Sequence, residues 1–338
     1  MTSKQIVYDT LNFKHFGRVP RDLWTVPAAW QEYPKEYEQI VQAYPSDISG
    51  APLVLKNKGP EKGDMYEIGE AVDAWGCKFT NIKRGVIGEV KEPLVTDDDW
   101  NGAKNVNTPQ HWLSLDIDET NKKIEEAFSD KFIFAGVPAP FEQLQFIRGT
   151  ENLYMDLLDP PKKMLEFMER MHDFYCRYMA KLALLNVDAL DFNDDWGSQR
   201  ALLISPKLWE KYFMPMYADY AAVAKKHNKK VFMHSDGYIL DIIPKLIDIG
   251  VDALNSQIFC MGVEKLRQFR GKITFWGEID RQNILARQTQ KDVREAVKLV
   301  YDNLYLNGGC IAQCEFGSGA KPENVMEVFK TWDLLQNQ

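Results

Sequence analysis

The 338-residue chain has no long apolar run, and its longest apolar stretches are only as long as a strand. A membrane-spanning helix needs about 20 consecutive apolar residues, so the sequence predicts no transmembrane segment. Basic residues form no stripe either. The 41 Lys and Arg are scattered among 49 Asp and Glu, and the net charge is −8. This balance argues against nucleic acid as a partner.

Cysteine and histidine are scarce, at five residues each. Five cysteines in a chain of this size do not make a disulfide framework, so we expect free thiols in a reducing compartment. No apolar signal segment follows residues 1–5, and we therefore expect a cytoplasmic protein. A glycine-rich turn after the first predicted strand is also missing, which disfavours an open dinucleotide-binding sheet.

What the chain does contain is a repeated pattern of apolar runs that stop abruptly at polar residues. One predicted strand ends in His234 and Asp236 and is followed by a helical pattern over 238–250. A second predicted strand then ends in Asn255 and Gln257. In parallel α/β proteins, sites are built at the carboxyl ends of strands. This segment therefore indicates both a fold class and a location for the chemistry.

At least seven segments read as strands, and helical stretches separate most of them. They are 19–24, 132–136, 187–192, 230–233, 251–254, 273–276 and 308–315. Consecutive parallel strands need such helical crossovers. A single (β/α)8 TIM barrel over residues 1–338 explains the count best, with one strand hidden in the less regular first half. An open doubly wound sheet is the structural alternative.

The chain is longer than the roughly 250 residues that are typical of this barrel. The surplus lies at about 45–108, a segment rich in Lys, Asp, Glu and Gly, with a predicted hairpin of 77–81 against 86–90. No linker rich in Pro, Gly or Ser separates it from the rest. We interpret it as an amino-terminal insertion over one end of the barrel and not as a separate domain.

Polar residues at five predicted strand ends would converge on one mouth of such a barrel. They are Asp194 and Asp195; His234 and Asp236; Asn255 and Gln257; Glu278 and Asp280; and Cys310, Cys314 and Glu315. Histidine nitrogen, cysteine sulfur and carboxylate oxygen suit zinc, and an open fourth position would make the metal a Lewis acid. His234 is the only histidine at a predicted strand end, and for it a ligand role and a structural role weigh about equally.

Each of these residues also has a structural interpretation. Cys310 and Cys314 share a face on either a strand or a helix, and a cysteine is most often buried. Asp194 and Asp195 point in opposite directions on a strand, so at most one faces the mouth, and either can cap a helix. Asp280 can cap the helix that begins near residue 282. The remaining cysteines are expected to pack in the interior: Cys77, Cys176 and Cys260.

Two carboxylates are expected in the site even without a metal. Asp236 and Glu278 both follow strongly apolar runs and stand next to glycine, which lets a substrate approach the backbone closely. Their shared environment predicts that at least one carboxyl pKa is raised. Trp24 and Trp196 lie near predicted strand ends, where aromatic walls suit a bulky or planar substrate.

Several short motifs occur in a specific order along nearly the whole chain. They are Arg18-Val19-Pro20, Asp73-Ala74-Trp75-Gly76-Cys77, Asn-Asp-Asp-Trp-Gly-Ser-Gln at 193–199, Ile-Ser-Pro-Lys-Leu-Trp at 204–209, His-Ser-Asp-Gly at 234–237, Gly-Val-Asp-Ala-Leu-Asn at 250–255, Gly-Glu-Ile-Asp at 277–280 and Lys-Pro-Glu-Asn-Val at 321–325. The ordered set resembles the uroporphyrinogen decarboxylase superfamily. That resemblance implies a (β/α)8 barrel with its site at the carboxyl ends of the strands.

The superfamily holds two activities. Its decarboxylases bind the acidic side chains of a tetrapyrrole through arginines near the amino terminus. The corresponding segment of this chain, residues 23–33, has no arginine. Its corrinoid-dependent methyltransferases have a zinc site of His-x-Cys plus a late cysteine. Here His234 and Cys314 match that pattern, but Asp236 replaces the middle cysteine. An aspartate suits a harder acceptor, such as an ether oxygen.

The resemblance therefore implies an enzyme, a metal-assisted methyltransferase that moves a methyl group from a small methylated substrate to a corrinoid on a separate protein. The expected residues are His234, Cys314 and Glu278 for zinc; Asp195, Asp236 and Glu278 for catalysis; and Trp24, Trp196, Asn255 and Gln257 for substrate. The alternative is a decarboxylase for a smaller carboxylated substrate, with Asp194 or Asp195 as its electrostatic group. A non-catalytic scaffold would leave the polar strand ends unexplained.

Overall fold

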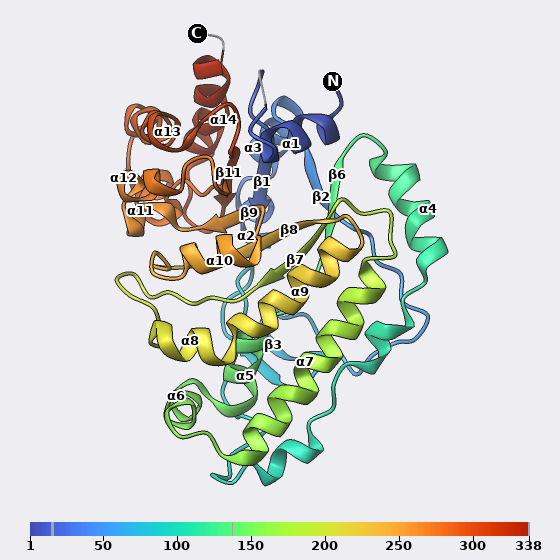
Figure 1. Cartoon of the computed structure of the whole chain (residues 1–338). Coiled ribbons are helices and arrows are strands. Elements are labelled where there is room, and N and C mark those ends of the chain that lie inside the picture. The colour runs from blue at the N-terminus through green and yellow to red at the C-terminus, as the bar shows by residue number, and fades with distance from the viewer. Residues whose placement is uncertain (15–16, 137, 337–338) are drawn as a thin grey trace.

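The computed structural model describes residues 1–14, 17–136 and 138–336, and it contains one sheet of eight parallel strands (Figure 1). In sheet order they are β1 (Arg21–Thr25), β11 (Cys310–Phe316), β10 (Thr274–Trp276), β9 (Ala253–Ser256), β8 (Lys230–Ser235), β7 (Ala189–Asn193), β6 (Phe132–Ala135) and β2 (Ile48–Gly50). The two ends of this order meet because the Asp47 amide donates to the Arg21 carbonyl at 2.8 Å. The predicted (β/α)8 barrel is confirmed.

Helices connect the strands and surround the sheet (Figure 1). They are α1 (Ser3–Leu11), α2 (Pro27–Glu32), α3 (Pro34–Ala43), α4 (Ile117–Phe128), α5 (Pro140–Arg148), α6 (Thr150–Leu158), α7 (Lys162–Leu182), α8 (Pro206–Tyr212), α9 (Met214–Lys226), α10 (Ile243–Ile249), α11 (Ile258–Met261), α12 (Val263–Leu266), α13 (Gln290–Leu304) and α14 (Pro322–Gln336). Within the described residues, none of these helices has the length and apolar character needed to cross a bilayer.

The strand hidden in the first half is β2, and it lies inside the segment predicted as the insertion. Only Ile48 of its three residues is both apolar and buried, so the strand shows no alternating pattern. The extra segment therefore begins after Gly50, and not at Pro45 as predicted. It contains a small antiparallel sheet of β3 (Gly69–Val72), β4 (Lys78–Asn81) and β5 (Glu89–Val90). The pairing of β4 with β5 is the predicted hairpin, and β3 is an additional strand.

The helix predicted over 238–250 is shorter at its start. Helix α10 begins at Ile243 because Pro244, which has no N–H to donate, fits the first turn of a helix. It ends as predicted at Gly250, whose φ of 90° is in the left-handed region that favours glycine.

Side chains of the barrel strands alternate between the barrel interior and the surrounding helices. The interior cluster consists of Val7, Leu11, Ile48, Phe132, Ala189, Phe232, Ala253, Trp276 and Ile311. Val7 and Leu11 come from α1, which contacts β2, β6 and β11. Helix α1 therefore closes the amino-terminal end of the barrel, and a substrate must enter from the opposite end.

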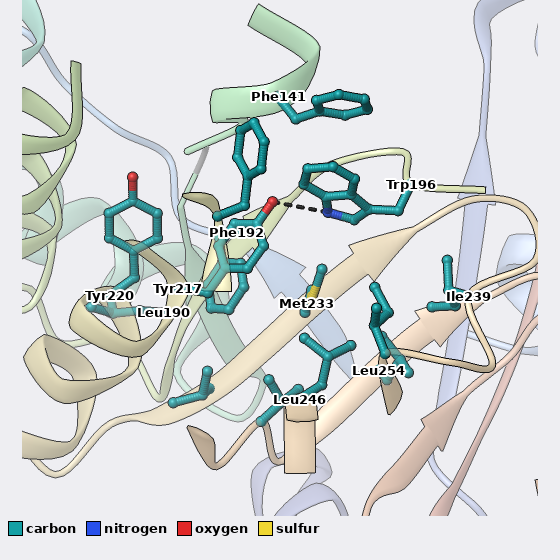
Figure 2. Packing of buried hydrophobic residues seen from close by; sticks show 14 of the residues in the cluster. Phe141, Leu190, Phe192, Trp196, Tyr217, Tyr220, Met233, Ile239, Leu246 and Leu254 are labelled. Atoms are coloured by element: carbon teal, nitrogen blue, oxygen red, sulfur yellow. Dashed lines mark hydrogen bonds between the residues drawn. The ribbon is translucent and has the colours of Figure 1, made fainter. Parts of the chain in front are cut away.

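The larger apolar core lies between the strands and the helices, and Figure 2 shows part of it. Phe192 of β7 stacks on Tyr217 of α9, with ring centroids 5.0 Å apart. Trp196 stacks on Phe141 of α5 at 4.0 Å, and its indole N–H donates to the Tyr217 hydroxyl at 2.9 Å. These contacts fix α5 and α9 against the end of β7.

A buried carboxylate joins the same elements. Asp194 accepts hydrogen bonds from the Phe141 amide at 3.0 Å, the Glu142 amide at 2.7 Å and the Tyr217 hydroxyl at 2.5 Å. Two of these donors are amides of the first turn of α5, which have no partner within the helix. Asp194 therefore caps a helix, as the sequence allowed, and that helix is α5, which follows β6 in the chain.

Replacing Asp194 with alanine should lower the free energy of unfolding by about 2–4 kcal/mol, because three buried donors lose their acceptor. Urea unfolding followed by circular dichroism measures this change. The exposed Asp241, replaced in the same way, is the matched control and should change stability by less than about 0.5 kcal/mol. Equal effects of the two substitutions would show that the cap contributes little.

Candidate active site

The loops after β7 and β8 touch backbone to backbone. The Gly197 amide donates to the Asp236 carbonyl at 3.1 Å, and a Cβ on Gly237 would lie 1.9 Å from the Gly197 oxygen. Gly237 also has a φ of 78°, which favours glycine. This close approach places Asp195 and Asp236 next to each other at the carboxyl-terminal mouth of the barrel.

His234 points into the barrel from the end of β8, and Asn255 of β9 holds its ring. The Asn255 amide nitrogen donates to the Trp276 carbonyl at 2.5 Å, so its oxygen faces the histidine. That oxygen lies 2.6 Å from His234 Nδ1, which must therefore carry a proton and donate it. Asn255 thus orients the imidazole so that Nε2 faces the mouth, and the residue predicted to bind substrate positions His234 instead.

Two carboxylates face the free edge of this ring. His234 Nε2 lies 3.4 Å from Asp195 Oδ1 and 3.8 Å from Asp236 Oδ1. The Asp236 amide donates to Asp195 Oδ1 at 2.9 Å. One donor atom from each of the three residues lies within 4.8 Å of the others. One imidazole and two carboxylates in this arrangement fit a divalent cation, and Asn255 supplies the outer hydrogen bond typical of metal-bound histidine.

The same carboxylates control protonation of the ring. Burial alone would lower the pKa of His234, but the hydrogen bond and charge of Asp195, with the charge of Asp236, raise it to about 9. Burial would raise the pKa of Asp195, yet His234 and the Asp236 amide hold it below its usual range. Without a cation, the site is therefore an imidazolium paired with carboxylate.

Arg281 joins three acidic residues at the rim of the site, and sequence reasoning missed it. Its guanidinium lies 2.7 and 2.8 Å from the two Glu278 carboxylate oxygens and 2.5 Å from Asp236 Oδ2. Its Nε lies 3.7 Å from Glu315 Oε1. The structure thus brings Asp236 and Glu278 together, as predicted, through a bridging arginine. Both Glu278 oxygens face this arginine, so Glu278 fits a metal-ligand role less well than Asp195 does.

Several carboxyl groups near the mouth hold their protons more tightly than usual. Burial raises the pKa of Glu278 to about 7, although the charge of Arg281 opposes the shift. Burial and the charge of Asp195 raise the pKa of Glu142 to about 7. Burial also raises the pKa of Glu315. The upward shift at Glu278 agrees with the prediction of at least one raised carboxyl pKa.

Cys314 does not lie with His234. On β11 the inward-facing side chains are Ile311, Gln313 and Glu315, and Cys314 points the other way into the apolar layer beneath the helices. It is fully buried there, and burial raises the pKa of its thiol. The predicted ligand set of His234, Cys314 and Glu278 therefore does not fit a metal, because the cysteine is on the wrong face of its strand.

The two tryptophans that were predicted to bind substrate lie in different parts of the structure. Trp196 is fully buried between α5 and α9 (Figure 2), so it does not line the mouth. Trp24 faces the barrel interior, with its ring centroid 5.2 Å from that of His234. Gln257 remains at the mouth, where it lines a small cavity with Glu278 and accepts from the Gly237 amide at 3.2 Å.

Below His234 the barrel interior is polar as well as aromatic. One Asp22 oxygen accepts from the indole N–H groups of Trp24 and Trp276, each at 2.8 Å. Burial raises the pKa of Asp22 to about 7. Asp191 Oδ1 and both amide atoms of Gln313 are buried there without a hydrogen-bond partner among the residues that the structure describes. Unpaired polar groups next to a site are candidates for contact with substrate or water.

A cleft of about 580 Å³ opens onto the mouth. Tyr66, Val86 and Ile87 of the extra segment line one side, and Arg281 and Glu315 line the other. Residues of the extra segment therefore form part of the wall of this cleft.

In the comparison with family models, residues 68–333 match the model described as Uroporphyrinogen decarboxylase (URO-D). Comparison with curated proteins gave no match. Among solved structures, a methyltransferase from Methanosarcina mazei is 13% identical, with a TM-score of 0.71 and 99% of each chain covered. A B12-independent methionine synthase from Shewanella sp. W3-18-1 is 12% identical, with a TM-score of 0.41, 96% of this chain and 97% of that chain covered. At such identities the first structure shows a shared fold alone.

Replacing Asp22 with asparagine should make stability less dependent on pH. Because the pKa of Asp22 is near 4 in an unfolded chain and about 7 here, the unfolded state binds fewer protons between these values, and wild-type stability falls as pH rises. The amide oxygen can still accept from both indoles. Relative to the wild type, the variant should gain roughly 2 kcal/mol between about pH 5 and about pH 8.

Urea unfolding at the two pH values measures this difference. Asp241→Asn, at an exposed position, is the control and should follow the wild-type profile. Parallel stability profiles for Asp22→Asn and the wild type would show that burial does not raise the pKa of Asp22.

Proposed function

Because the chain belongs to the uroporphyrinogen decarboxylase (URO-D) family, we propose that it is the methyltransferase kind of member, which takes a methyl group from a small methylated substrate and delivers it to a corrinoid on a separate protein. The observation that carries the proposal is the convergence of Asp195, His234 and Asp236 at the barrel mouth. The fold that the chain shares with the M. mazei methyltransferase is compatible with methyl transfer at this mouth.

Asp195, His234 and Asp236 would hold a divalent cation, with zinc as the first candidate. When bound, such a cation supplies Lewis acidity toward the heteroatom that carries the methyl group. The chain's own residues do the positioning. Asn255 fixes the imidazole, and Arg281 holds Asp236 at the rim.

The walls of the site suit a small substrate. Trp24 offers an aromatic face beside His234, and Trp276 meets it edge-on at 5.3 Å. Burial raises the pKa of Glu142 and of Glu278 to about 7, so each binds a proton more readily than an exposed carboxyl group does. Either carboxyl can therefore hold a proton and give it to a leaving heteroatom.

The electrostatics disfavour the alternative, a decarboxylase for a carboxylated substrate. The carboxylates of Asp195, Asp236 and Glu315 face the mouth, and Arg281 is already engaged with acidic side chains. A substrate carboxylate entering there would meet like charges before it met a free cation. A neutral substrate meets no such barrier.

Metal analysis tests the proposed donor set. Wild-type protein should bind one equivalent of zinc at the mouth, and His234→Ala and Asp236→Asn should each lower the affinity of that site at least about tenfold. Cys314→Ala is the matched control, because the thiol faces away from the barrel interior, and it should retain the metal. Full retention of this zinc in both site variants would overturn the assignment.

The activity is tested with a corrinoid-carrying protein, a panel of compounds that carry an isotope-labelled methyl group, and the purified chain. Label should move to the corrinoid protein with the wild type and with Cys314→Ala, and not with His234→Ala. Release of CO2 from a carboxylated substrate, without any methyl transfer, would establish the decarboxylase alternative instead.

A further inference from the structure

A second group of metal-ligand side chains lies on the outer wall of the barrel, away from the mouth. His172 and Cys176 are one turn apart on α7, and Asp219 faces them from α9. These two long helices pack side by side (Figure 1). The sequence predicted only packing for Cys176, because its neighbours along the chain gave no sign of Asp219. We call His172, Cys176 and Asp219 the outer cluster.

The three donor atoms of the outer cluster lie within 4.8 Å of one another. His172 Nε2 lies 2.9 Å from Asp219 Oδ2 and 3.7 Å from Cys176 Sγ. Zinc bonds of about 2.0–2.3 Å at tetrahedral angles would separate nitrogen from oxygen by about 3.3 Å and nitrogen from sulfur by about 3.6 Å. Sγ is also 3.8 Å from Nδ1, so the sulfur lies over the imidazole ring and not along the direction of the Nε2 lone pair. A cation at Nε2 would therefore enter with a rotation of the Cys176 or His172 side chain that brings Sγ to the Nε2 side.

We propose that the outer cluster is a zinc-class metal site, with His172, Cys176 and Asp219 as three ligands and solvent at the fourth position. Imidazole and thiolate together select borderline and soft cations over Mg²⁺ or Ca²⁺. Two ligands at positions i and i+4 of one helix share a face, as metal-binding helices require.

The surroundings of the outer cluster fit a cation. His172 Nδ1 lies 3.4 Å from the hydroxyl of the buried Tyr220, whose oxygen can accept a hydrogen bond from the Nδ1 N–H while Nε2 binds metal. Asp173 adds a second carboxylate nearby, and Arg177 pairs with that residue at 2.9 Å. Burial and the charges of Asp219 and Asp173 raise the pKa of the Cys176 thiol to about 12. A metal would displace this proton.

A cation held in this way would cross-link α7 to α9. Helix α9 also carries Tyr217, which donates to Asp194 at the end of β7. Binding to the folded state alone raises stability by mass action, so zinc should raise the Tm of the wild type. The site is independent of the proposed methyl transfer, because the outer cluster shares no residue with the mouth.

Titration of the full chain with Co²⁺ tests the site through a signal that only a thiolate ligand gives. We expect one equivalent of cobalt to produce near-ultraviolet sulfur-to-cobalt absorption in the wild type. Cys176→Ser should abolish this absorption, and the exposed Asp219→Asn should weaken the binding at least about tenfold without disturbing the core. Cys260→Ser, at another partly buried cysteine, is the matched control and should keep the signal.

The mouth is tested in parallel, since its donor set contains no thiol. Asp236→Asn should leave the thiolate absorption unchanged, so failure at one site is distinguishable from failure at the other. Absence of thiolate absorption in the wild type, or its persistence in Cys176→Ser, would overturn the proposal. So would a zinc-dependent rise in Tm that is equally large in the wild type and Asp219→Asn.

Discussion

The alternation of side chains along eight closed strands is the constraint on which the site depends. Each inward position either fills the barrel or faces the mouth, and each outward position joins the apolar layer under the helices. His234 and Glu315 face inward, whereas Cys314 faces outward, although it is next to Glu315 in the chain. Asp194 and Asp195 divide in the same way, one capping α5 and the other facing His234. Neighbours in sequence therefore have unrelated roles.

Charge balance is the second constraint at the mouth. Glu278 is only 4% exposed, and an unpaired buried carboxylate would be costly. Arg281 pairs with it and with Asp236, while His234 pairs with Asp195 through a proton or, as proposed, a cation. The two arrangements are neighbours, because Asp236 lies in both. Any ligand that changes the charge at His234 therefore also changes the electrostatic environment of Arg281.

Sequence periodicity predicted the barrel, seven of its strands and the polar strand ends, because these depend on local patterns. It missed β2, because a strand of three residues is too short to show alternation. It also left the face of Cys314 open, because a spacing of four residues does not reveal direction, and the ligand role that the family resemblance implied for Cys314 was wrong. Arg281 follows Glu278 by three residues, yet its contact with Asp236 depends on the close packing of separate loops. Cys176 and Asp219 likewise meet only when α7 and α9 pack. Local sequence patterns therefore could not predict these contacts between distant segments.

The replacement of cysteine by Asp236 gains a physical meaning from this geometry. A thiolate at that position would accept only weak hydrogen bonds from the guanidinium of Arg281. The Asp236 carboxylate accepts a short, charged hydrogen bond from Arg281 and still faces His234. The resulting donor set of one nitrogen and two carboxylates is harder than one with two thiolates, and it favours binding an oxygen atom over a sulfur atom. Under the proposed function, a methyl group on oxygen therefore fits this mouth better than a methyl group on sulfur.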